Sequence, residues 1–140
     1  MISAKQSRLI SAILLLGLLV GCNANSSKRE VLASGSQVEV RSYQTKTYDI
    51  QDKKRVLRTV MSTLQDLGFV IDKADNMIGI VSATKLNGYN LAMSVSVRSK
   101  GEQMVVRANA QYNLQAIEDP GPYQDFFASL DKGLFLEKNL

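Results

Sequence analysis

Strict alternation of apolar and polar residues in two consecutive segments sets the narrowest limits on the fold. The apolar positions are Tyr89, Leu91, Met93, Val95 and Val97, then Met104, Val106, Ala108, Ala110 and Tyr112. Because successive side chains of a strand point to opposite faces of a sheet, each segment is a strand with one apolar face. The residues between them are mostly small or polar. This pattern predicts an antiparallel sheet that is covered on one face and open on the other.

Two shorter strands are predicted before this pair. The first covers Phe69 to Lys73 and leads into a turn at Asp75-Asn76, and the second covers Met77 to Lys85. Gly79 in the second strand predicts a bulge or a close approach of another backbone. Asn87-Gly88 is a strong hairpin signal and predicts a type I′ turn into the alternating pair.

A further strand is expected at the start of the domain, from Gln37 to Tyr48. Apolar and β-branched residues recur there with a period of two: Val38 and Val40, then Tyr43, Thr45 and Thr47. This period is typical of extended backbone. The apolar phase shifts between Val40 and Tyr43, so a bulge or an exposed face is expected at that point.

One amphipathic helix is predicted after this strand. Its apolar residues recur at helical spacing: Val56, Leu57, Val60, Met61, Leu64 and Leu67. Asp49 is the expected N-cap, and Asp52 adds a negative charge near the positive start of the helix. Gly68 is expected to end the helix at positive φ, with Phe69 packing back on Leu64 as in a Schellman motif.

A last helix is predicted after the chain break at Asp119-Pro120-Gly121-Pro122, because proline suits the first turn of a helix. Its expected apolar face comprises Tyr123, Phe126, Phe127, Leu130 and Leu134, broadened by Phe135 and Leu136. The predicted element order is therefore β-α-β-β-β-β-α. This order indicates a two-layer α+β domain whose two helices pack on one face of an antiparallel sheet.

The N-terminus has the features of a signal peptide. Lys5 and Arg8 precede an apolar run of 12 residues, Leu9 to Val20. This length suits the apolar part of a signal peptide and is short of the roughly 20 residues that a membrane-spanning helix needs. An ordinary secretory signal with a chance cysteine, or a short buried helix, is the plain alternative.

The run ends in Leu19-Val20-Gly21-Cys22, which resembles the lipobox of bacterial lipoproteins. The resemblance implies cleavage after residue 21 and an N-acyl, S-diacylglyceryl Cys22 as the first residue of the mature chain. In the Gram-negative sorting rule that accompanies this motif, Asn23 in place of Asp implies transfer to the outer membrane, facing the periplasm. Residues 22–36 are then a lipidated, flexible tether, and residues 37–140 form a single domain.

The net charge and the residue composition limit the functions that are expected of the chain. The formal charge is +4, but Lys5 and Arg8 leave with the signal, which weakens a nucleic-acid interpretation. There is no His, and the single Cys is used for the lipid, so no metal site, no other cofactor and no catalytic residue is expected. Asp72 with Asp75, and Glu118 with Asp119, are interpreted as turn and cap residues rather than as catalytic pairs.

Four polar residues on the two alternating strands are the candidate interaction face: Arg98, Arg107, Asn109 and Gln111. The ordinary interpretation is a solvated sheet face. The alternatives are a docking surface for another envelope protein, or a site for an anionic lipid or nucleic acid. A separate possibility is an apolar groove between helices and sheet, lined by Met61, Met77, Met93 and Met104, but core packing is the favoured interpretation of these residues in a domain of this size.

Two groups of segments resemble a family of small proteobacterial lipoproteins. They are Leu64 to Asp75 with Val81 to Leu86, and Tyr123 to Phe127 with Leu130, Lys132 and Phe135-Leu136. The resemblance implies a non-catalytic accessory role beside envelope systems such as efflux pumps. The element order is also similar to the helix-grip domains of the BamC type. The main hypothesis is an accessory lipoprotein with an envelope protein partner, and the alternative is a periplasmic domain that binds a lipid or peptide between helices and sheet.

Overall fold

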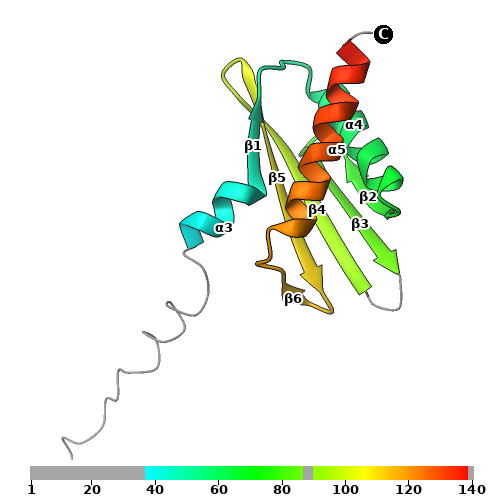
Figure 1. The fold of residues 1–140 in the computed structure, drawn as a ribbon. Helices are drawn as coiled ribbons and strands as arrows, with labels where there is room; N and C mark the ends of the chain where they lie inside the picture. Colours follow the sequence, from blue (N-terminus) through cyan, green and yellow to red (C-terminus); the bar gives the residue numbers. More distant parts are fainter. Residues whose placement is uncertain (1–36, 87–89, 139–140) are drawn as a thin grey trace, which may run out of the picture. The chain divides into compact units, whose positions relative to one another are not determined.

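Six strands form one antiparallel sheet in the computed structural model, which describes residues 37–86 and 90–138 (Figure 1). They are β1 Thr45–Tyr48, β2 Val70–Asp75, β3 Ile80–Leu86, β4 Asn90–Lys100, β5 Gln103–Tyr112 and β6 Gln115–Ala116. The order across the sheet is β1-β5-β4-β3-β2, and β6 pairs with the end of β5. All described residues belong to one compact unit, Ser34–Leu140.

Three helices in the described part of the chain accompany the sheet: α3 Gln37–Gln44, α4 Lys53–Asp66 and α5 Gly121–Lys138. Figure 1 shows α4 and α5 side by side on one face of the sheet, and α3 beside the β1 edge. The predicted α+β class, with helices packed on one face of an antiparallel sheet, is confirmed. Among the described helices, none is both long enough and apolar enough to cross a membrane.

The alternation predicted for β4 and β5 is confirmed by their pairing and burial. Val95 lies opposite Ala108, and both are fully buried on the face that the helices cover. Ser96 lies opposite Arg107 on the other face. The core between sheet and helices contains large side chains that are almost fully buried: Val56, Leu57, Val60, Leu64, Val81, Val95, Val97, Val106, Tyr123, Phe126 and Leu130.

The expected strand over Gln37–Tyr48 is wrong in its first part, because Gln37–Gln44 forms α3 and only Thr45–Tyr48 is extended. Val40 and Gln44, four residues apart, are both buried, as on one face of a helix. Val38 is 77 % exposed. The spacing of two between Val38 and Val40 therefore does not reflect one buried face, because only Val40 is buried.

The first predicted helix exists as α4, but its expected N-cap is wrong. Asp52, with extended backbone, accepts a hydrogen bond on its carboxylate from the Arg55 backbone N–H at 3.0 Å. Asp49 lies three residues earlier and accepts instead from the Gln103 side chain. A cap must directly precede the first helical residue to reach the free N–H groups of the first turn, and here the first helical residue is Lys53.

The predicted Schellman ending of α4 is confirmed. Gly68 has φ of +84°, its N–H donates to the carbonyl of Gln65 at 2.9 Å, and the N–H of Phe69 donates to Leu64 at 2.9 Å. Gly79 also has the predicted close neighbour. A Cβ at Gly79 would lie 2.4 Å from the Val97 carbonyl oxygen.

The last helix is confirmed with one correction to its apolar face. Tyr123, Phe126, Phe127, Leu130 and Leu134 are buried as predicted, whereas Phe135 and Leu136 are 68 % and 61 % exposed. Residues that directly follow Leu134 point away from the core because each helical residue turns by about 100°. The type I′ turn at Asn87-Gly88 lies outside the described residues, although Leu86 does pair with Asn90 across the hairpin.

Candidate interaction face

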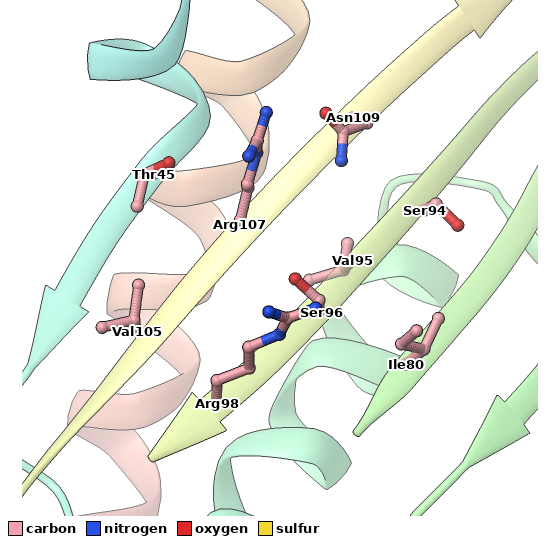
Figure 2. Close-up of a pocket in the computed structure, with 9 residues that line it drawn as sticks. All are labelled: Thr45, Ile80, Ser94, Val95, Ser96, Arg98, Val105, Arg107 and Asn109. Atoms are coloured by element: carbon pink, nitrogen blue, oxygen red, sulfur yellow. The ribbon is translucent and has the colours of Figure 1, made fainter. Parts of the chain in front are cut away.

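The open face of the sheet is the side that α4 and α5 leave uncovered. Strand pairing places the odd-numbered residues of β5 and the even-numbered residues of β4 on this face, and Thr45 of β1 lies beside them opposite Arg107. The helices lie behind the sheet when this face is viewed from the front (Figure 2). Because alternate residues of a strand share a face, the polar half of the predicted alternation forms this surface.

Arg98 and Arg107 come from neighbouring strands and lie on the open face. Arg107 pairs with Ser96, and Arg98 pairs with Val105, so the two arginines are diagonal neighbours. Diagonal neighbours on one face lie about 7–8 Å apart, which long side chains span. Both arginines border one hollow of about 470 Å³, and Figure 2 shows Ser96 beside the end of the Arg98 side chain.

The hollow has polar and small side chains around it. The described residues that line it are Thr45, Ile80, Ser94, Val95, Ser96, Arg98, Val105, Arg107 and Asn109. None of these lining residues is acidic. Guanidinium groups stay charged at any physiological pH, so the hollow carries two positive charges.

The guanidinium groups of the pair have no acidic partner among the described residues, where the ion pairs are Lys46 with Asp131 and Arg55 with Glu137. The Nε of Arg107 is shielded from solvent and has no hydrogen-bond partner within the same part of the chain. An unpaired, shielded N–H carries a free-energy cost.

Of the four predicted interaction residues, three border the hollow: Arg98, Arg107 and Asn109. Gln111 is exposed opposite Ala92 on the same face, two residues beyond Asn109. Ser94, Ser96 and Thr45 are additional lining residues. The two serines could be predicted from the sequence, because they occupy the polar positions of the alternation in β4. Thr45 was not foreseeable, because the sequence does not reveal that β1 pairs with β5.

The two edge strands of the sheet, β2 and β1, are poorly suited to pairing with a strand from another protein. On β2 the pairing with β3 is irregular between Ile71 and Lys73, and Asp72 lies within the irregularity. Bulges and charges of this kind block strand addition. At the other edge β1 contains only the residues Thr45–Tyr48. The open face is therefore the better surface for a partner.

The acidic residues considered as pairs have structural roles. Asp75 accepts from the backbone N–H groups of Met77 and Ile78, and Asp119 accepts from Gly121 at the start of α5. Asp72 accepts from the Thr84 hydroxyl at 2.6 Å. Among the described residues, no group of three or more His, Cys, Asp or Glu is arranged to hold a metal ion.

The alternative ligand site between the helices and the sheet corresponds to a small pocket. A pocket of about 150 Å³ lies between α4, α5 and the sheet, lined by Leu67, Phe69, Lys85, Leu91, Met93, Pro122 and Asp125. Ligand sites typically hold about 300–1,000 Å³. Core packing, the favoured interpretation of the methionines, is confirmed for Met93 and Met104, whereas Met77 is 91 % exposed in the β2–β3 turn.

Comparison with protein-family models gives no match, and comparison with curated proteins gives no significant one. The signal peptide, Cys22, Asn23 and the tether at residues 22–36 lie outside the described residues.

Proposed function

We propose that the protein is a lipoprotein held at the periplasmic face of the outer membrane, where it binds another envelope protein as a non-catalytic accessory component. A transport or efflux complex is the kind of assembly that the family resemblance suggests. The lipobox at Leu19–Cys22 and the sorting residue Asn23 support the location. Two or more acyl chains give a stable membrane anchor, so no spanning helix is needed.

The observation that carries the binding role is the uncovered sheet face. Arg98 and Arg107 border its hollow without an acidic partner among the described residues. Arginine is enriched at protein interfaces, where it often contributes strongly to binding. The hydroxyl, amide, guanidinium and aliphatic groups of this surface are suited to binding a partner through hydrogen bonds, charge and apolar contacts.

The binding role is tested by extracting the lipidated, full-length protein from membranes with a mild detergent. We expect it to migrate as a complex with a second envelope protein of reproducible identity. Recovery only as a free monomer, both before and after chemical crosslinking in cells, would contradict the proposed function.

The anchor is tested separately by metabolic labelling with palmitate. Cys22→Ala should abolish labelling and release the chain from the membrane fraction. Ser27→Ala, in the same N-terminal segment, is the matched control and should remain labelled. Labelling that persists in Cys22→Ala would refute the lipid anchor.

A further inference from the structure

We infer that the open face binds an acidic segment of the partner protein, with carboxylates seated against Arg98 and Arg107. This inference rests on the proposed function and adds the chemistry of the partner. It starts from two fixed positive charges, on neighbouring strands, that have no counter-charge among the described residues. A binding surface with unpaired charge favours a partner of the opposite sign.

A carboxylate group matches the charge and the hydrogen-bond donors of the Arg98 and Arg107 side chains. The guanidinium group presents a planar fork of N–H donors that pairs with a carboxylate through two parallel hydrogen bonds. Two such forks, at diagonal positions of one face, match two carboxylates on one short segment.

The shape of the hollow admits a segment of chain rather than a single ion. Its volume is about 470 Å³, and three of its lining residues, Thr45, Ser94 and Ser96, have small side chains that leave room for a chain segment. Figure 2 shows Thr45 on β1 and the two serines on β4, with Arg107 and Asn109 on β5 between these two strands. Their hydroxyl and amide groups supply donors and acceptors for the backbone of the segment. Val105 and Ile80 add apolar contact at its sides.

Three other occupants fit this surface less well. A second copy of the chain that docked through the same face would place arginines against arginines. Single-stranded nucleic acid is usually held on stacked aromatic rings, whereas the described lining residues are aliphatic, hydroxyl, amide and guanidinium types. An anionic membrane surface is usually bound by larger clusters of four to eight basic residues, and only two basic residues border the hollow.

The test uses the full-length, lipidated protein in cells, with a photo-crosslinking amino acid in place of the exposed Asn109. We expect a crosslink to a different protein, mapped by mass spectrometry to a segment that contains at least two Asp or Glu residues. R98Q combined with R107Q should lower the crosslink yield by at least about tenfold, equivalent to about 1.4 kcal/mol. K54Q combined with R58Q removes the same charge from exposed positions of α4 and should leave the yield unchanged.

A crosslink to lipid, to nucleic acid, to a second copy or to a segment without carboxylates would overturn the inference. So would a yield that falls equally in both double variants, because general charge would then explain it. No crosslink from position 109 would also overturn it, and the detergent-extraction experiment would still report on the proposed function. Circular dichroism of each variant, compared with the wild type, excludes unfolding as the cause of a lost crosslink.

Discussion

At the scale of single residues, the Tyr123 hydroxyl joins several segments of the domain. It donates to the Ile117 carbonyl at 2.6 Å and accepts from Gln44 Nε2 and from the Ala110 backbone N–H, each at 3.1 Å. Tyr123 is fully buried. Tyr123→Phe should therefore lower the free energy of unfolding by about 2 kcal/mol, because three buried polar groups lose their partner at once. Urea denaturation followed by circular dichroism measures the change.

Tyr43→Phe is the matched control for this prediction. The Tyr43 ring packs against Tyr123 with centroids 5.6 Å apart, and its hydroxyl donates to the Glu118 carbonyl in a solvent-exposed position. Water replaces an exposed hydrogen bond at little cost, so Tyr43→Phe should cost less than about 1 kcal/mol. Equal losses in the two variants would show that burial of the Tyr123 hydroxyl is not what matters.

Tyr48 gives a prediction for alkaline pH. Burial, together with its hydrogen bond to Asp131 at 2.9 Å and the charge of that carboxylate, raises the pKa of the Tyr48 hydroxyl above its usual value of 10.0. The folded state then holds the proton more tightly than the unfolded state. The resulting stability is complete below pH 10 and is lost as the pH rises above 10.

Tyr48→Phe should lessen this loss. The difference between pH 9 and pH 11 in the free energy of unfolding should be smaller in the variant than in the wild type by at most about 1 kcal/mol, because solvent screens a half-buried group. Urea denaturation at both pH values gives the comparison. An identical alkaline loss in the variant would assign the effect to other groups.

At the scale of elements, the contact of α4 with α5 depends on Gly133. A Cβ at this position would lie 2.7 Å from Cγ2 of Thr59, which is buried and β-branched and so has little room to move. Gly133→Ala gains up to about 1 kcal/mol of helix propensity but introduces this clash. We expect a net loss of about 1–2 kcal/mol, because overpacking of a core contact costs more than the gain.

Thr59→Ser tests the origin of that loss. Serine keeps the hydroxyl, whose one proton is donated to the Arg55 carbonyl or to the Glu137 carboxylate, and it removes the methyl group that meets position 133. The double variant G133A with T59S should therefore be more stable than the sum of the single effects predicts. A double-mutant cycle from chemical denaturation measures this coupling. Additive effects would mean that the helices separate rather than clash.

The elements differ in how well sequence patterns predict them. β4 and β5 follow directly from their alternation because one side of the sheet is packed and the other is open. α3 could not be predicted, since its burial depends on contacts with segments far along the chain, such as the hydrogen bond from Gln44 to Tyr123. β6 was also missed, because it is only two residues long and follows a turn in which Asn113 and Leu114 have positive φ.

The candidate site could also be predicted only in part from the sequence. The polar phase of β4 and β5 predicts that Arg98 and Arg107 share a face, and the registers of the two strands place them diagonally. The hollow itself was not predictable. It depends on the place of β1 beside β5, which brings Thr45 next to Arg107, and strand order is a property of the assembled sheet.

At the scale of the whole molecule, the proposed location and the proposed binding face depend on different parts of the chain. The proposed location rests on residues 1–23, whereas the proposed binding rests on side chains held by β1, β4 and β5. Asn23→Asp should therefore redirect the protein to the inner membrane, by the sorting rule that accompanies the lipobox, without changing how the domain folds. Separation of the two membranes on a density gradient, with an antibody to the protein, measures the shift.

Asn23→Gln is the control and should stay with the outer membrane, since it keeps an uncharged amide. Circular dichroism and the urea midpoint of Asn23→Asp should match those of the wild type, because Asn23 precedes Ser34, where the compact unit of sheet and helices begins. If Asn23→Asp stayed in the outer-membrane fraction, the sorting rule would not govern this chain. If it moved and its crosslink from position 109 disappeared with it, the partner would belong to the outer membrane, because the binding face itself is unaltered.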